Sequence, residues 1–231
     1  MIRQLRDKKV IFFDVGYTLD APASGDWMLT GKFLELAGER LRLRGGDEIR
    51  KAMEDGIAFL AKDHLVTSEE KEIAQFSAFY AMLSDRLGLG LSRNGAELIA
   101  RDRAFNMQNY VPYPGVTEVL AALHKTHRLG VISDTWPSIE RQLEYLGVSR
   151  YLSFSTFSCH VGVFKPDRRM YLDALEKSGV SARETVFIDD SARNLEGAAA
   201  LGITPVLITA NPASDADVPY LKIRDLRELI I

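Results

Sequence analysis

Acidic, basic and hydroxyl side chains come directly after several apolar segments of this sequence. Asp14 follows the run VIFF, and Ser133 closes the run LGVIS. Asp189 and Asp190 close the segment TVFIDD, while Lys165 precedes a proline and a helix-like segment. Such uninterrupted apolar runs are typical of strands that are buried on both faces of a parallel sheet. Because parallel strands end at one edge of their sheet, we expect these side chains to meet in one crevice.

This set of groups is suited to phosphoryl transfer. A carboxylate that attacks phosphorus forms an aspartyl phosphate and splits one difficult step into two easier ones. The anionic phosphoryl group repels that carboxylate unless positive charge is supplied, and a lysine together with Mg²⁺ held by oxygen ligands supplies it. A hydroxyl group and backbone N–H groups at a strand end or helix start hold the remaining phosphoryl oxygens.

The elements that position these groups alternate between strand and helix. After about residue 110, repeated βα units predict a mainly parallel, doubly wound α/β sheet with right-handed crossovers. We expect the strands at 10–13, 129–133, 151–157, 185–189 and 204–209, and the helices at about 116–125, 139–146, 170–177 and 195–201. The helix at about 170 is expected to have Asp167 as its N-cap.

An all-helical segment interrupts this pattern. Apolar residues recur at helical spacing, with no convincing strand between them. Thr67 and Glu70 have the spacing of a capping box that opens one of these helices. We therefore expect a helical domain at 21–109, inserted into a core domain that consists of 1–20 and 110–231.

Composition and charge restrict the possible partners. The chain has 231 residues, of which 46% are hydrophobic and 26% are charged, and its formal net charge is -3. This charge argues against a nucleic-acid binder, and the first apolar run is too short to span a membrane. The single cysteine, Cys159, excludes an intrachain disulfide and is expected to be a small buried residue. We expect a cytoplasmic protein that is a monomer or a homodimer.

Four segments resemble, in order, the motifs of the haloacid dehalogenase (HAD) superfamily. They are DVGYTL, VISD, GVFKPDRRMYLDAL and VFIDDSARNLEGAAALG, and together they span the whole expected core. The helical insertion after the first motif resembles the C1-type cap of subfamily I. The resemblance implies a Rossmann-like hydrolase that acts on a small phosphorylated substrate, with Mg²⁺ as its cofactor.

The resemblance also implies roles for the charged residues. Asp14 corresponds to the nucleophile and to a metal ligand, and Gly16 to a ligand through its backbone carbonyl. Asp189 or Asp190 completes the protein ligands of Mg²⁺. Lys165 corresponds to the residue that holds the phosphoryl group together with Asp14.

Three further positions belong to the phosphoryl-binding loops in this resemblance. Ser133 corresponds to the residue that hydrogen-bonds the phosphoryl group, and Thr18 helps to shape the turn after the nucleophile. Asp134 stands where many relatives carry asparagine, and it lies beside the expected substrate site. We expect it to orient the loop DTWPS, in which Thr135 or Ser138 can cap the following helix.

Gly16 is the main departure from the family pattern, because family phosphatases commonly carry an aspartate there as general acid and base. Losing such a group costs about 10²–10⁴ in rate, which matters less for acyl and aryl phosphates because their leaving groups are stabilised anions.

Three alternatives to a phosphatase therefore remain: a metal-independent dehalogenase, a phosphonate-cleaving enzyme with a cap lysine, and a catalytically weak protein that binds a phosphorylated ligand. The candidate cap lysines are Lys32, Lys51, Lys62 and Lys71. The acidic pair at 189 and 190 favours a metal site, because such a pair beside Asp14 is costly without a cation.

Overall fold

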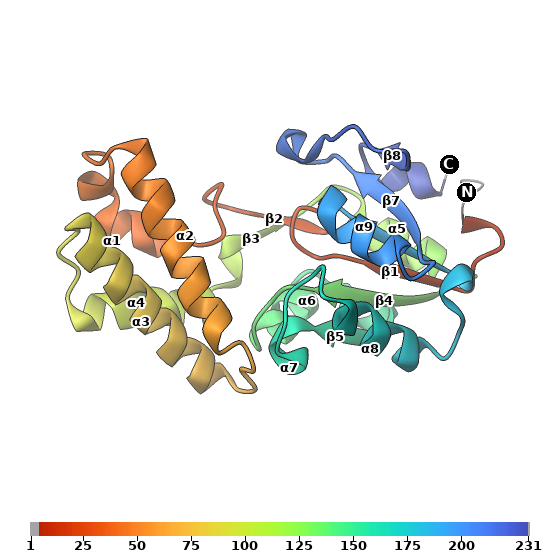
Figure 1. The fold of residues 1–231 in the computed structure, drawn as a ribbon, viewed down its shortest axis with the longest axis horizontal. Helices are drawn as coiled ribbons and strands as arrows, with labels where there is room; N and C mark the ends of the chain where they lie inside the picture. Colours follow the sequence, from red (N-terminus) through yellow and green to blue (C-terminus); the bar gives the residue numbers. More distant parts are fainter. Residues whose placement is uncertain (1–4, 231) are drawn as a thin grey trace. The chain divides into compact units, whose positions relative to one another are not determined.

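The computed structural model describes residues 5–230, with Pro212 described by its backbone alone. A six-stranded parallel sheet forms its α/β part, in the order β5-β4-β1-β6-β7-β8 (Figure 1). The strands are β1 (Val10–Phe13), β4 (Arg128–Ser133), β5 (Leu152–Phe157), β6 (Thr185–Asp189), β7 (Thr204–Ile208) and β8 (Leu221–Ile223). The predicted α/β class and parallel sheet are confirmed. Strand β8 was not predicted, because a three-residue strand with an exposed lysine carries no apolar run.

The centre of the sheet is completely buried. All four residues of β1 are inaccessible to solvent, and Phe12 pairs in register with Gly130 of β4 and Phe187 of β6. A Cβ atom at Gly130 would lie 2.2 Å from the ring of Phe154 on β5, so only glycine permits that close packing. The sheet therefore gives the carboxyl end of β1 a rigid position between β4 and β6.

Helices follow the strands, as the alternating pattern predicts. They are α5 (Val116–Leu123), α6 (Ile139–Tyr145), α7 (Ser158–Val161), α8 (Arg168–Ser178) and α9 (Ala192–Ala199). Asp167 accepts a hydrogen bond from the N–H of Arg169, so its prediction as the N-cap of α8 is confirmed. Helix α9 begins three residues before the predicted start, because the cap at Ser191 and not the first apolar residue sets its beginning.

Four helices form the inserted part. They are α1 (Gly31–Leu41), α2 (Gly46–Lys62), α3 (Glu69–Leu87) and α4 (Arg93–Phe105). The N-cap of α3 is Ser68, whose side chain accepts from the N–H of Lys71. The predicted capping box at Thr67 is therefore wrong by one residue. Within the described helices, none combines the length and the apolar character that crossing a bilayer requires.

The chain divides into two compact units. The α/β unit contains the chain up to Ala21, Pro112–Thr135, and the chain from Leu143 onward, whereas the helical unit contains Pro22–Val111 and Trp136–Gln142. The short strands β2 (Asp20–Pro22) and β3 (Tyr110–Pro112) pair with each other where the chain passes between the units. No sequence pattern predicted that the segment Trp136–Gln142 belongs to the helical unit.

Candidate active site

The carboxyl ends of three neighbouring strands bring polar side chains together. Asp14 directly follows β1, and its N–H continues the ladder by donating to the carbonyl of Ile188 at 2.8 Å. Ser133 is the last residue of β4, and Asp189 is the last residue of β6. All three side chains are buried. The arrangement follows from the strand order, because β1 lies between β4 and β6.

Lys165 bridges two of these carboxylates. Its ammonium group donates to Asp14 Oδ1 at 2.7 Å, to Asp189 Oδ2 at 2.8 Å and to the carbonyl of Ile132 at 3.1 Å. Burial disfavours the charge, but the carboxylates of Asp14, Asp189 and Asp134 outweigh it and hold the pKa of Lys165 well above its ordinary value. The ammonium is therefore a permanent positive charge beside Asp14.

The negative charge around Asp14 nevertheless exceeds what Lys165 neutralises. Burial raises the pKa of Asp14 well above its ordinary range; Lys165 opposes this, and the carboxylates of Asp189 and Asp190 reinforce it. Three carboxylates and one ammonium leave a formal charge of minus two. The site thus favours either a proton or a further cation.

Asp189 is held by the start of helix α9. Its Oδ1 accepts the N–H of Ser191 at 2.7 Å, and the side-chain amide of Asn194 donates to both carboxylate oxygens at 3.2 and 3.1 Å. These bonds fix the direction of the carboxylate. Asn194 therefore braces the loop between β6 and α9.

Asp190 has a different environment. Its Oδ2 accepts from the hydroxyl of Ser214 at 2.7 Å. Burial, reinforced by Asp189, raises the pKa of Asp190 to about 6. Ser214 lies 24 residues further along the chain, in a segment without a motif, and sequence reasoning missed it for that reason.

Asp134 braces the loop that carries the lysine. Its Oδ1 accepts the backbone N–H of Lys165 at 2.9 Å, so its carboxylate links the end of β4 to that loop. Burial raises the pKa of Asp134. The hydroxyl of Ser138 donates to Glu72. A cap accepts from backbone N–H groups, so capping of α6 by Thr135 or Ser138 stays a prediction.

The turn after Asp14 contains Gly16, whose backbone forms a bridge, and Thr18, whose side chain is buried. Gly16 forms a β-bridge with Asp20, and Tyr17 adopts a φ of 56°, which is uncommon for a residue with a side chain. Among the described residues the buried hydroxyl of Thr18 has no hydrogen-bond partner. Thr18 lines a separate cavity of about 150 Å³ with Tyr113 and others.

The acidic residues can hold a metal ion. Asp14, Asp189 and Asp190 each offer one oxygen, and these atoms lie within 4.8 Å of one another. Mg²⁺ prefers carboxylate and carbonyl oxygens. An all-oxygen donor set with an excess charge of minus two therefore fits this cation.

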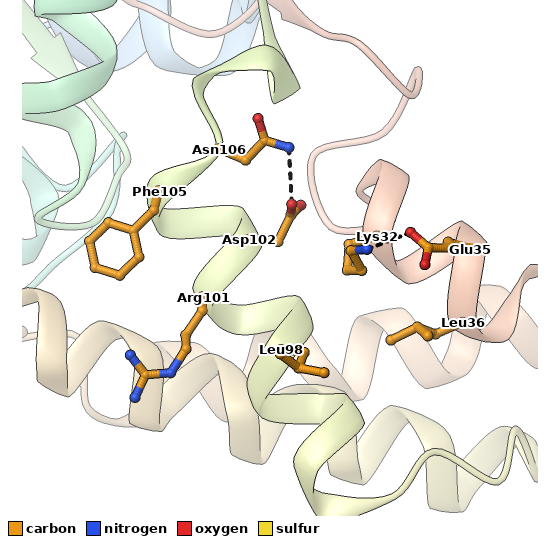
Figure 2. A pocket seen from close by; sticks show the side chains of 8 residues that line it. All are labelled: Lys32, Glu35, Leu36, Leu98, Arg101, Asp102, Phe105 and Asn106. Carbon is orange, nitrogen blue, oxygen red and sulfur yellow. Dashed lines mark hydrogen bonds and ion pairs between the residues drawn. The ribbon is translucent and has the colours of Figure 1, made fainter.

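The helical unit contains a cavity of its own. It measures about 500 Å³ and lies between α1 and α4 (Figure 2). Lys32, one of the candidate cap lysines, lines it and donates to Glu35 at 2.5 Å. This bond raises the pKa of Lys32, whereas an amine nucleophile requires a lowered pKa. The contact therefore argues against Lys32 as the lysine of a phosphonate-cleaving enzyme.

Magnesium should stabilise the protein more at neutral than at acidic pH. Asp190 has a raised pKa, so the metal-free protein loses stability as pH rises from about 4 to about 6, and the ionised oxygens then become available to the cation. We expect the Mg²⁺-induced rise in melting temperature to be larger at about pH 7.5 than at about pH 5. Asp190→Asn should reduce this difference. An equal effect of Mg²⁺ at both pH values would contradict the prediction.

Fold and site together define a doubly wound α/β protein with a carboxylate–lysine centre at the end of its central strand. A family model described as haloacid dehalogenase-like hydrolase matches residues 31–202. The chain belongs to this family, as its four motifs predict.

Curated relatives of the chain include phosphatases and nucleotidases. Glyceraldehyde 3-phosphate phosphatase of Methanopyrus kandleri is 26% identical over 96% of this chain and 95% of its own length. Phosphoserine phosphatase of Thermus thermophilus is 28% identical over 61% of this chain, which spans 57% of that protein. The GMP/IMP nucleotidase YrfG of Escherichia coli is 30% identical over 64% of this chain and 65% of its own length.

Solved structures share the fold over nearly the whole chain. The putative HAD-hydrolase YfnB from Bacillus subtilis, bound to magnesium, superposes with a TM-score of 0.65 at 18% identity and 97% coverage of both chains. The L-2-haloacid dehalogenase PA0810 superposes with a TM-score of 0.66 at 19% identity, covering 96% of this chain and 97% of that one. At these identities the likeness concerns the fold alone.

Proposed function

We propose that this protein is a Mg²⁺-dependent phosphatase that acts on a small phosphorylated metabolite through an aspartyl phosphate on Asp14. One observation carries the proposal. Asp14 is buried at the end of the central strand and hydrogen-bonded to Lys165, in a cluster of three carboxylates whose candidate ligand oxygens lie within 4.8 Å of one another. An anionic attacker surrounded by compensating positive charge is what an anionic substrate needs.

The reaction consists of two displacements at phosphorus. A carboxylate oxygen of Asp14 attacks, the bond from phosphorus to the leaving oxygen breaks, and the aspartyl phosphate forms. Water then attacks phosphorus, which releases phosphate and restores the carboxylate. Lys165 remains charged and holds Asp14 and the phosphoryl group, while Ser133 donates to a phosphoryl oxygen. With glycine at position 16, the leaving oxygen takes its proton from solvent, so stabilised leaving groups react faster.

Four groups would hold the cation in this account. They are the carboxylates of Asp14, Asp189 and Asp190 and the backbone carbonyl of Gly16. When bound, Mg²⁺ supplies the positive charge that lets the anionic substrate approach the carboxylates. Residues 21–109 would act as a cap that excludes water during the reaction.

The relatives support the substrate class. The three relatives described above are named as phosphatases or nucleotidases, and the glyceraldehyde 3-phosphate phosphatase aligns over nearly its full length. We therefore infer a small phosphorylated metabolite as the substrate.

Carbon–halogen hydrolysis is the second candidate. It is favoured by the missing carboxylate at Gly16, because dehalogenation does not need that group. The cluster of Asp14, Asp189 and Asp190 weighs against it, since burial already raises the pKa of Asp14 and a metal-free enzyme would have to bear this charge.

Release of phosphate and of chloride separates the two functions. Acetyl phosphate, p-nitrophenyl phosphate and a nucleoside monophosphate are assayed with Mg²⁺ and with a chelator, beside a 2-haloacid without metal. We expect Mg²⁺-dependent phosphate release that is fastest with acetyl phosphate. Chloride release without metal, and no phosphate release, would establish the dehalogenase instead.

Gly16→Asp should raise activity on alkyl phosphates. Gly16 is not among the glycines with a positive φ, so its backbone conformation does not itself require glycine. A general acid there is expected to increase the rate by about 10²-fold or more, with a smaller gain for acetyl phosphate. The measurement is the ratio of kcat/KM values for the two substrate types in both proteins, with Gly16→Asn as the matched control. An unchanged ratio would show that the missing carboxylate does not limit the reaction.

A further inference from the structure

The chain leaves the α/β unit immediately after the phosphoryl-binding loop. Ser133 ends β4 and Asp134 follows it within that unit, whereas Trp136–Gln142 belongs to the helical unit. Only Thr135 separates Asp134 from this segment. Whatever holds Trp136–Gln142 therefore acts on the loop through two peptide bonds.

A buried carboxylate of helix α3 holds this segment. Glu72 is 1% exposed, and its oxygens accept the backbone N–H of Ser138 at 2.8 Å and the hydroxyl of Ser138 at 2.7 Å. Arg103 of helix α4 donates to the same carboxylate at 3.1 Å. Hydrogen bonds to a charged and desolvated group are stronger than neutral ones.

The indole of Trp136 provides a second attachment. Its N–H donates to the side-chain oxygen of Gln75 at 2.7 Å, and its ring packs edge-on against Phe76 at 4.9 Å. The guanidinium of Arg103 lies over the rings of both Phe76 and Trp136, at 3.8 and 5.2 Å. The residue that neutralises Glu72 therefore also covers the anchored tryptophan.

The other end of the loop is fixed as well. The N–H of Thr135 donates to the hydroxyl of Ser158 at 2.7 Å, and that hydroxyl donates to the carbonyl of Thr135 at 3.2 Å. Asp134 accepts the N–H of Lys165. Ser158 and Asp134 thus hold the start of this segment, and Glu72 is the carboxylate that holds its end at Ser138.

We propose that Glu72 is a positioning residue for the phosphoryl-binding loop, and that it sets the orientation of Ser133 and Asp134 through Ser138. This inference rests on the proposed function. Asp134 is bonded to the backbone of Lys165, so a loosened attachment at Ser138 also reaches the lysine that holds Asp14. Misplacement of binding groups by less than 1 Å lowers rates strongly, even when the altered residue is distant from the chemistry.

Glu72→Gln tests this role. The variant keeps the shape of the side chain but removes the charge that Arg103 and Ser138 share. We expect kcat/KM to fall about tenfold and the inhibition constant of inorganic phosphate to rise by a similar factor, at a temperature where both proteins are folded. Glu70→Gln is the matched control, because Glu70 lies in the same helical turn and is exposed. It should leave both constants unchanged.

A second variant distinguishes loss of loop positioning from a general loss of stability. Ser138→Ala retains the Glu72–Arg103 pair and the backbone N–H bond, and removes only the hydroxyl donor. We expect a change of about two- to threefold in the same direction. Melting temperatures are measured for every protein. If Glu72 has a purely structural role, its substitution lowers the melting temperature without changing the phosphate inhibition constant.

The outcomes separate this inference from the proposed function. An active wild type whose phosphate inhibition constant is unaltered by Glu72→Gln and Ser138→Ala would overturn the positioning role alone. A wild type that neither releases nor binds phosphate would overturn both.

Discussion

Replacement of Asp14 by asparagine should abolish phosphate release, with a loss of about 10⁴-fold or more. The variant removes the attacking oxygen, so only the slow reaction by water in the remaining site survives. It should also be at least as stable as the wild type without metal. The pKa of Asp14 is raised in the folded protein, which means that its ionised form destabilises the fold at neutral pH. The measurements are phosphate release with Mg²⁺ and the melting temperature in chelator.

An exposed aspartate offers the control for this experiment. Asp217 is exposed, and Asp217→Asn should retain full activity and an unchanged melting temperature. Equal phosphate release by Asp14→Asn and the wild type would remove Asp14 from the reaction and favour a protein that only binds a phosphorylated ligand.

Lys165→Met should have the largest effect on stability. It leaves the buried carboxylates of Asp14 and Asp189 without the ammonium that both accept from. Removing one partner of a buried ion pair destabilises by about 3–5 kcal/mol, and the loss of charge beside the proposed nucleophile Asp14 should lower activity by about 10³-fold. Denaturant unfolding with and without Mg²⁺ measures the stability. The cation should restore part of it, because it replaces some of the missing positive charge.

Lys177 provides the comparison on the surface. It pairs with Asp173 in helix α8 and its side chain is 41% exposed, so Lys177→Met should change stability by less than about 1 kcal/mol. If Lys165→Met proved as stable and as active as Lys177→Met, the bridging ammonium would have neither a structural nor a catalytic function.

The parallel sheet was predictable because its central strands are short apolar runs. The predicted ranges 10–13 and 185–189 coincide with β1 and β6, since each run is buried on both faces and ends at a polar residue. The start of α3 was not predictable to the residue, because Thr67 and Ser68 are both good N-caps. The structure places the N-cap at Ser68, whose backbone is extended. Local patterns define elements well and choose poorly between adjacent caps.

The meeting of Asp14, Lys165 and Asp189 could be expected from the strand ends and from the family motifs. The bond from Ser214 to Asp190 could not, since no motif accompanies that serine. The bond between Glu72 and Ser138 could not be expected either. These residues are 66 positions apart, and nothing in the sequence distinguishes Glu72 from other helical glutamates. Contacts of this kind depend on tertiary packing and leave no periodic signal.

Capture of the aspartyl phosphate tests the central claim most directly. The protein is mixed with Mg²⁺ and acetyl phosphate, quenched in acid and digested, and the peptide that contains residue 14 is examined by mass spectrometry. We predict one added phosphoryl group on Asp14 in the wild type, and none with a chelator or in Asp14→Asn. Turnover of acetyl phosphate without any phosphoryl group on that peptide, or with the group on another residue, would contradict the account.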